Sequence, residues 1–371
     1  MPESLCWAKV KDFLVLKRIF RKFSSIRSGH AALFPLSCRA DGVKKIIYYS
    51  TGRWSLGFVW RGVASSQALT VFPGRPEVAI CDSIEELKRL FSSSNAYVFV
   101  MSGSRIGEVL RAGVSPQRIV YYAPHIEVNK VVPRVKELHA ILTQSLSEYN
   151  LFLTKGVEPS KVHHFPAGVD RSSFSPPLQI SESACAIDVL FVGSSYSSRQ
   201  VGERFRKGYS LQIDLLSRLA ESGLRVAVVG PGWGEDQALV PAQVQVLDPP
   251  YSDYPNLMRS ARLLCSVAVQ EGGPLSFPEA LACGCSTLSM MTGFPLQFAS
   301  GCEGVWHMPM GASADEWLVK IQSILAQQRP PSWPLDGARE AFLQSADYEQ
   351  LGRQLVSVCF PTLAGELSQS D

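Results

Sequence analysis

Short runs of β-branched and aromatic residues alternate with longer amphipathic stretches through most of this chain. Alternation of this kind is typical of βαβ units, in which a helix connects two parallel strands of one sheet. The pattern occurs in two series, and the expected strands are residues 45–50, 77–81, 97–101, 119–122, 140–143 and 162–165 in the first and residues 188–192, 225–229, 244–247, 263–266, 286–290 and 305–308 in the second. The sequence therefore predicts an α/β protein with two parallel sheets.

The two series are separated by residues 171–186, which are rich in Ser and Pro and poor in apolar side chains, as linkers are. The chain has 371 residues, of which 46% are hydrophobic and 19% charged, and this is enough for two cores. We predict five parts: a basic N-terminal segment at 1–40, a first Rossmann-like domain at 41–170, the linker at 171–186, a second Rossmann-like domain at 187–340, and a C-terminal crossing helix and tail at 341–371.

Several helices have recognisable starts. Ser83 with Glu86, and Ser313 with Glu316, have the spacing of a capping box, and they predict helices at 84–91 and 314–326. A further helix is expected at 209–221. The tail at 337–358 is also helical in pattern, and it must bury its apolar face across one or both domains.

Positive charge is concentrated at the N-terminus. Residues 1–53 contain eleven Lys or Arg and three Asp or Glu, a balance of +8 that leaves −5 for the rest of a chain whose net charge is +3. No basic face with stacking aromatic residues follows, so a nucleic-acid partner is not expected. Within this segment the apolar residues recur at helical spacing between the cations, at Phe13, Leu16, Phe20 and Phe23. That pattern fits equally a helix at an anionic membrane surface and a helix packed on the first domain.

The cysteines indicate a reducing compartment. Their number, nine, is odd, and apart from Cys283 and Cys285 they are scattered singly through apolar surroundings, so no disulfide framework is expected. The Cys-x-Cys pair lacks the spacing of a zinc site, and the adjacent His163 and His164 would face opposite sides of a strand, so we expect no metal site. Because neither a signal peptide nor a membrane-spanning run is visible, we expect a cytoplasmic protein, with peripheral contact at the inner membrane face if the N-terminal segment binds lipid.

Two glutamates stand out in an apolar, Gly-rich stretch. Glu271 and Glu279 are the only charged residues between positions 263 and 302. A desolvated carboxylate is costly unless it is paired, so both are expected to face a ligand or a cleft. Pro274 predicts a short helix that begins near Leu275, and Gly284 predicts its end. The amides at such a helix start can bind phosphate.

The string from Glu271 to Gly284, Glu-Gly-Gly-Pro-Leu-Ser-Phe-Pro-Glu-Ala-Leu-Ala-Cys-Gly, resembles the C-terminal domain of the group 1, or family 4, glycosyltransferases of GT-B architecture. By this resemblance, the first glutamate approaches hydroxyls of the donor sugar and Glu279 binds the nucleotide ribose. The amides around Leu275 and Ser276 meet the donor diphosphate, and the glycines allow close approach of the ligand. The implied donor-binding residues in this string are Glu279, Gly272, Gly273, Leu275 and Ser276.

Three further segments resemble the family in order and spacing, so the likeness runs from about residue 140 to the C-terminus. They are residues 164–176, which resemble the interdomain crossing, residues 189–193 followed by Lys207 and Gly208, and residues 226–232. Two positions depart from the family pattern: Ser194 stands where the family has an arginine, and Ala167 replaces the crossing asparagine. Three arginines of the following loop could replace the missing family arginine: Arg199, Arg204 and Arg206. We assign Arg199 and Arg206, together with Gly193, to donor binding.

The resemblance implies two Rossmann-like parallel-sheet domains facing a cleft and a retaining, metal-independent transfer of a sugar, most simply a hexose. The donor would be a nucleoside diphosphate sugar, with no other cofactor, and the acceptor a hydroxyl of a glycan, a lipid-linked molecule or a small molecule. Glu271, Lys207 and His125 are the expected catalytic residues, although His125 fits a structural role equally well. Lys207 would stabilise the leaving diphosphate, because no Asp-x-Asp metal clamp occurs in the chain. Alternative functions are a nucleotide-sugar epimerase of the same fold and a catalytically silent scaffold.

Overall fold

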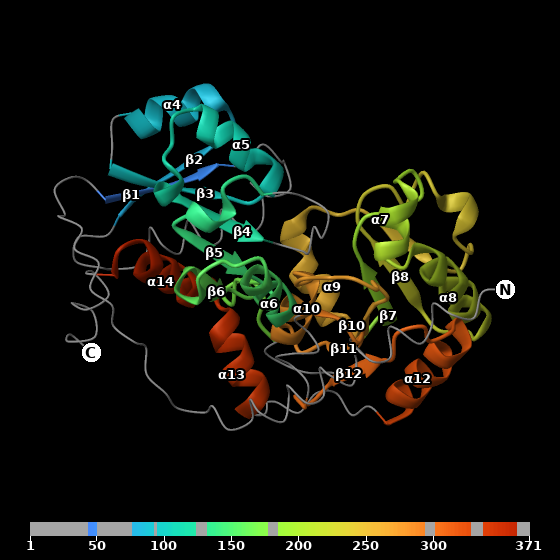
Figure 1. Ribbon diagram of the computed structural model, residues 1–371. Coiled ribbons are helices and arrows are strands. Elements are labelled where there is room, and N and C mark those ends of the chain that lie inside the picture. Colours follow the sequence, from blue (N-terminus) through green and yellow to red (C-terminus); the bar gives the residue numbers. More distant parts are fainter. Residues whose placement is uncertain are drawn as a thin grey trace. The chain divides into compact units, whose positions relative to one another are not determined.

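The computed structural model describes residues 44–49, 76–92, 95–123, 132–176, 185–293, 301–327 and 337–361. These residues form two parallel sheets of six strands each, and most of their strands are labelled in Figure 1. Every strand that the sequence pattern predicts is present, and each begins and ends within two residues of its expected position. The basic segment at 1–40 lies outside the described residues.

The first sheet has the strand order β2-β1-β3-β4-β5-β6. Its strands are β1 (Lys44–Tyr49), β2 (Glu77–Cys81), β3 (Asn95–Val100), β4 (Ile119–Ala123), β5 (Ala140–Thr143) and β6 (Val162–His164). All the neighbouring pairs are parallel. The connecting helices are α4 (Ile84–Ser92), α5 (Gly103–Arg111) and α6 (Leu146–Thr154), with short 3-10 turns at η1 (Pro116–Arg118), η2 (Val135–Glu137) and η3 (Pro159–Lys161).

The second sheet has the strand order β12-β11-β10-β7-β8-β9. Its strands are β7 (Ile187–Val192), β8 (Val226–Val229), β9 (Gln245–Leu247), β10 (Ala261–Ser266), β11 (Ser286–Met290) and β12 (Val305–Met308). The helices of this part are α7 (Val201–Arg206), α8 (Tyr209–Glu221), α9 (Tyr254–Arg259), α10 (Ser276–Ala282) and α12 (Ala314–Gln327), with 3-10 turns at η5 (Gln237–Leu239) and η6 (Tyr251–Asp253). From β7 outward the order reverses, as in doubly wound nucleotide-binding folds.

Each sheet is buried on both faces, which explains its continuous apolar strands. On β8, Val226 and Val228 pack into one core, whereas Ala227 and Val229 pack into another on the opposite face. On β4, Val120 belongs to a third core, and the fourth core covers the other face of the first sheet. The alternation follows from the two-residue period of a strand.

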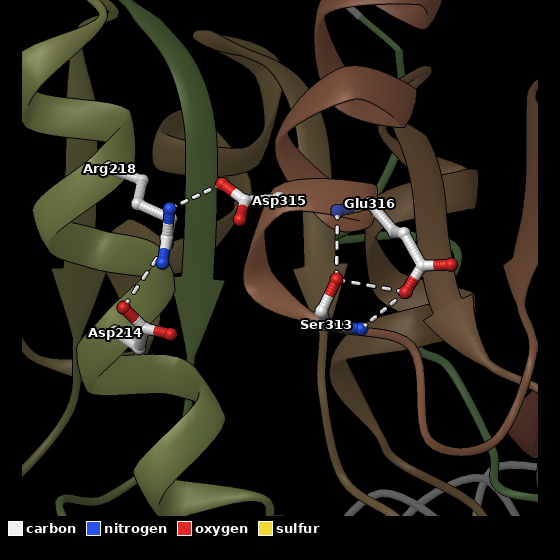
Figure 2. A network of polar contacts seen from close by, with 5 residues as sticks. All are labelled: Asp214, Arg218, Ser313, Asp315 and Glu316. Carbon is white, nitrogen blue, oxygen red and sulfur yellow. Dashed lines mark hydrogen bonds and ion pairs between the residues drawn. The ribbon is translucent and has the colours of Figure 1, made fainter.

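The predicted capping box at Ser313 is present at the start of α12 (Figure 2). The backbone amide of Ser313 donates to Glu316 Oε2 at 2.7 Å, and the amide of Glu316 donates to Ser313 Oγ at 3.3 Å. Beside it, Arg218 of α8 donates to Asp214 Oδ1 at 3.2 Å and is also ion-paired with Asp315 of α12. The Arg218–Asp315 pair joins the two helices that cover one face of the second sheet, but an exposed pair of this kind stabilises little.

The C-terminal tail forms two helices where the sequence pattern is continuous from 337 to 358. These are α13 (Gly337–Ala346) and α14 (Tyr348–Cys359), and they are separated at Asp347. The break occurs because Val169 pairs with the tail there: its amide donates to the carbonyl of Ala346 at 2.9 Å, and its carbonyl accepts from the amide of Tyr348 at 3.1 Å. Asp347 Oδ1 then caps α14 by accepting from the amide of Glu349 at 2.8 Å.

The two tail helices pack on different cores. Phe342 and Leu343 of α13 join the core of the second sheet with Phe277, whereas Leu351 and Leu355 of α14 join the core of the first sheet. The predicted crossing by the C-terminal helix is therefore present, and a pair of helices makes it. None of the helices in the described part of the chain is both long and apolar enough to cross a membrane.

Candidate functional site

The topological switch point of the second sheet lies between β7 and β10, the two strands at which the order reverses. Ligands of open α/β sheets bind outside the carboxyl ends of the strands at such a point. A cavity of about 70 Å³ is present there, and its lining includes Gly193 and Ser194 after β7, Val267 after β10, Lys207 and Glu271. Two of our expected catalytic residues therefore lie at the position that topology favours.

Lys207 and Glu271 form an ion pair in this cavity. Their side chains are 21% and 13% exposed, so the pair is largely shielded from water. A second cation is close, because Arg206 Nη1 lies 3.8 Å from Glu271 Oε2. The ammonium of Lys207 also lies 5.7 Å from the ring centroid of Tyr196, within the range of a cation–π contact. The site therefore holds two cations and one carboxylate around a small polar cavity.

Position 208 requires a glycine because the chain turns sharply after Lys207. Its φ is +66°, a value that side chains rarely adopt, and a Cβ there would lie 2.2 Å from the carbonyl oxygen of Val267. The turn brings the end of α7 against the loop after β10. The carbonyl of Arg206 accepts from the amides of Val269 and Gln270 at 2.9 and 3.1 Å, which connects the two loops that line the cavity.

The structure distinguishes the three arginines that could replace the family arginine. Arg206 lies at Glu271, as described above. Arg204 stacks on the ring of Tyr209, 5.1 Å from its centroid, and Arg199 is exposed. Arg206 is therefore the arginine that the fold brings to the site, whereas Arg199 is not brought into contact with Glu271.

The loop after β7 packs against the turn that follows β8. The sequence did not predict this contact. Trp233 Nε1 donates to the carbonyl of Gly193 at 2.8 Å, and Ser195 Oγ is hydrogen-bonded to the buried carboxylate of Asp236. Gly230 abuts the same loop, since a Cβ there would lie 2.6 Å from the Gly193 carbonyl oxygen. The glycines after β8 thus allow close packing of two loops.

The helix that carries Glu279 begins as predicted: α10 starts at Ser276, with Leu275 as its N-cap, and Gly284 follows its end with a φ of +84°. Glu279 itself is only 3% exposed and accepts a hydrogen bond of 2.5 Å from Tyr251 Oη. Burial raises the pKa of Glu279 to about 8, although the Tyr251 hydrogen bond opposes this shift. Tyr251 was not among the predicted site residues, and no sequence pattern pointed to it.

Residues of the first sheet reach the same loop. A Cβ on Gly273 would lie 3.2 Å from the side-chain amide of Gln144 and 3.0 Å from the Cβ of Ala167. Gln144 Nε2 donates to Tyr122 Oη at 2.5 Å. Glu148, at the start of α6, is 1% exposed, and burial is the largest cause that raises its pKa to about 7, with a smaller contribution from the charge of Glu271. The sequence had not suggested either Gln144 or Glu148.

Among the histidines that the structure describes, none belongs to a cluster of three potential metal ligands. His125 lies outside the described residues. His164 Nε2 is 3.2 Å from the carbonyl oxygen of Gln144, and burial lowers the pKa of His164 to about 4. Burial also lowers the pKa of His163. Among the residues that the structure describes, no three His, Cys, Asp or Glu side chains are grouped as ligands of a metal ion.

No protein-family model and no curated protein matches the chain by sequence. Solved structures do match. HepE of Anabaena, in a complex with UDP and glucose, has a TM-score of 0.63 at 12% identity, and the match covers 88% of this chain and 100% of HepE. Sucrose-phosphate synthase from Thermosynechococcus elongatus also has a TM-score of 0.63, at 14% identity and with the same coverage of both chains.

A third match is AviGT4, a glycosyltransferase involved in avilamycin A biosynthesis. Its TM-score is 0.60 at 16% identity, and the match covers 86% of this chain and 98% of AviGT4. Likenesses at this identity establish a shared fold. They confirm the predicted arrangement of two Rossmann-like parallel sheets.

Proposed function

We propose that this chain, whose two parallel sheets form the GT-B fold, is a glycosyltransferase that moves a sugar from a nucleoside diphosphate sugar to an acceptor hydroxyl. The observation that carries the proposal is the cluster of Lys207, Arg206 and Glu271 at the switch point of the second sheet. Two cations and a carboxylate beside a polar cavity suit a ligand that carries both phosphate and sugar hydroxyls.

Lys207 and Arg206 would bind the donor diphosphate. A leaving diphosphate develops negative charge as the glycosidic bond breaks, and cations that are already in place stabilise that charge without reorganisation. Charge-assisted hydrogen bonds from lysine and arginine to phosphate are among the stronger ones in proteins. The low exposure of Lys207 and Arg206, 21% and 19%, strengthens this effect, because little water screens them.

Glu271 would exchange its partner when the donor binds. In the free protein its carboxylate is held by Lys207. When phosphate oxygens replace Glu271 as the partner of the Lys207 ammonium, the Glu271 carboxylate becomes available to accept hydrogen bonds from hydroxyls of the transferred sugar. Glu279 would accept from the ribose, for which the hydroxyl of Tyr251 must give up part of its present contact. The amides at the start of α10 would face the diphosphate, and Gly193, Gly272 and Gly273 would let backbone approach it.

The proposed transfer retains the anomeric configuration and requires no metal ion. The departing phosphate would take the proton of the acceptor hydroxyl on the same face of the sugar as the new bond, so the bond to phosphate breaks as the bond to the acceptor oxygen forms. Crystal structures of HepE contain UDP and UDP-glucose, which makes UDP-hexoses the first donors to test. We further propose a cytoplasmic reaction on a glycan, lipid-linked or small-molecule acceptor.

A thermal-shift screen of nucleoside diphosphates and their sugar conjugates tests the proposal. Binding stabilises the folded chain by about 2.7 kcal/mol at a hundredfold excess over Kd, so a true donor should raise Tm measurably. Product analysis in the presence of EDTA then follows. Transfer to an acceptor or to water, undiminished by EDTA, supports the proposal, whereas isomerised donor indicates an epimerase. Absence of any ligand-induced shift across the panel would refute donor binding.

A further inference from the structure

Buried side-chain oxygens without a hydrogen-bond partner among the described residues include Gln144 Oε1, Glu148 Oε1 and Tyr348 Oη. The residues that carry them are 3%, 1% and 4% exposed. Leaving a buried polar atom unpaired costs about 1 to 3 kcal/mol, so native proteins contain few of them. Three together call for a physical explanation.

The residues that carry these oxygens contact the same segment, residues 271–279, or interact electrostatically with it. Gln144 Oε1 is 3.2 Å from the position that a Cβ on Gly273 would occupy. The charges of Glu148 and Glu271 interact, and so do Tyr348 and Glu279. Tyr348 and Tyr122 also interact electrostatically, and Tyr122 Oη accepts from Gln144 Nε2. The residues that carry the unpaired atoms therefore interact with both of the glutamates that we assign to the donor site, or contact the loop between them.

Local structure does not account for these atoms. Glu148 forms a capping box with Ser145, but only its Oε2 takes part, by accepting from the amides of Gln144 and Ser145 at 3.0 and 3.1 Å. A glutamine would serve in such a box as well as a glutamate. Tyr348 is the first residue of α14, and its ring packs against Gly168, a contact for which phenylalanine would suffice. Neither the cap nor the packing requires the unpaired oxygens.

We propose that Gln144, Glu148 and Tyr348 form the hydroxyl-binding face of the donor site, opposite Glu271 and Glu279. Gln144 Oε1 and Glu148 Oε1 accept hydrogen bonds from hydroxyls of the transferred sugar, and Tyr348 Oη exchanges one with the ribose beside Glu279. Two pure acceptors and one hydroxyl suit sugar hydroxyls, each of which both donates and accepts. Binding requires Gly273 to withdraw from Gln144. This inference rests on the proposed function and assigns residues of the first sheet and of α14 to the same ligand.

The test is a combination of ligand-free stability and ligand affinity in the full chain. Three variants remove one unpaired oxygen each: Gln144→Met, Glu148→Gln and Tyr348→Phe. Gln144→Met also removes the amide that donates to Tyr122 Oη. Their Tm is measured without ligand, and their Kd for UDP and for UDP-glucose is measured by calorimetry. If the unmodified protein binds neither, the pairs ADP with ADP-glucose and GDP with GDP-mannose are used instead.

The proposal predicts opposite effects in the two measurements. Without ligand, Tyr348→Phe should raise Tm by about 1 to 2 °C, because it removes an unpaired buried hydroxyl. Its affinity for UDP should fall about tenfold, since the ribose loses a partner. Gln144→Met and Glu148→Gln should weaken UDP-glucose binding about tenfold and leave UDP binding unchanged, because only the transferred sugar contacts them.

Two control variants separate this role from a structural one. Ser145→Ala removes the cap of α6 and retains the Glu148 carboxylate, so it should lower Tm without changing either Kd. Tyr49→Phe removes a hydroxyl that donates to Glu108 in the first sheet, and it should leave ligand affinity unchanged. If the three test variants lower Tm and leave both affinities unchanged, the oxygens are satisfied by buried water and the inference is wrong. If the unmodified protein binds no nucleotide sugar, the proposed function itself fails.

Discussion

The ammonium of Lys207 is ion-paired with the carboxylate of Glu271, 64 residues further along the chain. The pair joins the end of α7 to the loop after β10, and it occupies the switch point of the second sheet. Since each partner is the other's counter-ion in the free protein, a bound diphosphate must compete with Glu271 for Lys207. Donor binding and the release of Glu271 toward the sugar are therefore coupled.

Removing the side chain of Lys207 should lower turnover with any donor. We expect Lys207→Ala to lower turnover about 10- to 100-fold, because a charge-assisted hydrogen bond to phosphate contributes about 1.5 to 3 kcal/mol. The measurement is kcat/KM for the donor identified by the thermal-shift screen. Lys88→Ala, which removes an exposed lysine of α4, is the matched control and should change nothing. Equal rates for Lys207→Ala and the unmodified protein would contradict the assignment of this residue.

The two glutamates should have separable effects. Glu279→Ala should weaken binding of the nucleoside diphosphate, because the ribose loses its acceptor, whereas Glu271→Ala should mainly lower turnover. Each loss corresponds to about 1.5 to 3 kcal/mol. Calorimetry with the nucleoside diphosphate, combined with steady-state kinetics, distinguishes the two. Unchanged binding and unchanged turnover in both variants would remove the basis of the donor-site assignment.

Glu279 should make the stability of the protein depend on pH. Burial raises the pKa of Glu279 to about 8 in the folded state, so above pH 4.5 the folded chain binds more protons than the unfolded chain. Its contribution to stability is therefore complete below pH 4.5 and is lost as the pH rises toward 8, by about 1.4 kcal/mol per pH unit at most.

Urea denaturation of Glu279→Gln between pH 5 and 9 tests this dependence. The variant should lose less stability across this range than the unmodified protein. Glu148, whose pKa is also raised by burial, to about 7, remains in both proteins and provides a common background below pH 7. Parallel stability curves for the two proteins would show that Glu279 is ionised in the folded state at neutral pH.

Gly168 should tolerate no side chain. A Cβ at this position would lie 2.3 Å from the ring of Tyr348 and 2.8 Å from Leu351, both of α14. We expect Gly168→Ala to destabilise the protein by about 1 to 3 kcal/mol, because a rigid ring must be displaced from a packed core. Gly234→Ala is the control, since a Cβ there meets no atom within 4 Å. Equal unfolding free energies for the two variants would show that α14 can shift away from a Cβ at position 168 without loss of stability.

The basic N-terminal segment, which lies outside the described residues, allows one further test. If it binds an anionic membrane surface, its cations contribute about 1 kcal/mol each, and this contribution is screened by salt. Liposome co-sedimentation of the full chain should then fall steeply as ionic strength rises. A chain truncated to begin at Ser37 should bind weakly at every salt concentration. Equal sedimentation of the two would show that the segment packs on the protein or serves another purpose.

Most of the secondary structure could be predicted from local pattern. The strands were located within two residues, because most of them are runs of apolar residues buried on both faces, and this property is visible in the sequence. The edge strands β2, β9 and β12 are only partly buried. The start of α10 followed from Pro274 and its end from Gly284, because proline and glycine act on the backbone locally. The break at Asp347 was not predictable, since its cause is pairing with Val169, far away in the chain.

The residues of the candidate site also fall into two groups, those that the sequence predicts and those that only the tertiary structure reveals. The sequence by itself determined that Glu271 and Glu279 are isolated carboxylates in an apolar stretch and that Lys207 follows a strand and precedes a helix. Only the tertiary structure decided that Arg206, rather than Arg199, lies at Glu271. It also decided that Tyr251 holds Glu279, and that Gln144, Glu148 and Tyr348 carry unpaired oxygens around the same segment. The physical reason is that hydrophobic periodicity specifies which residues are buried, whereas hydrogen-bond partners depend on contacts between distant parts of the chain.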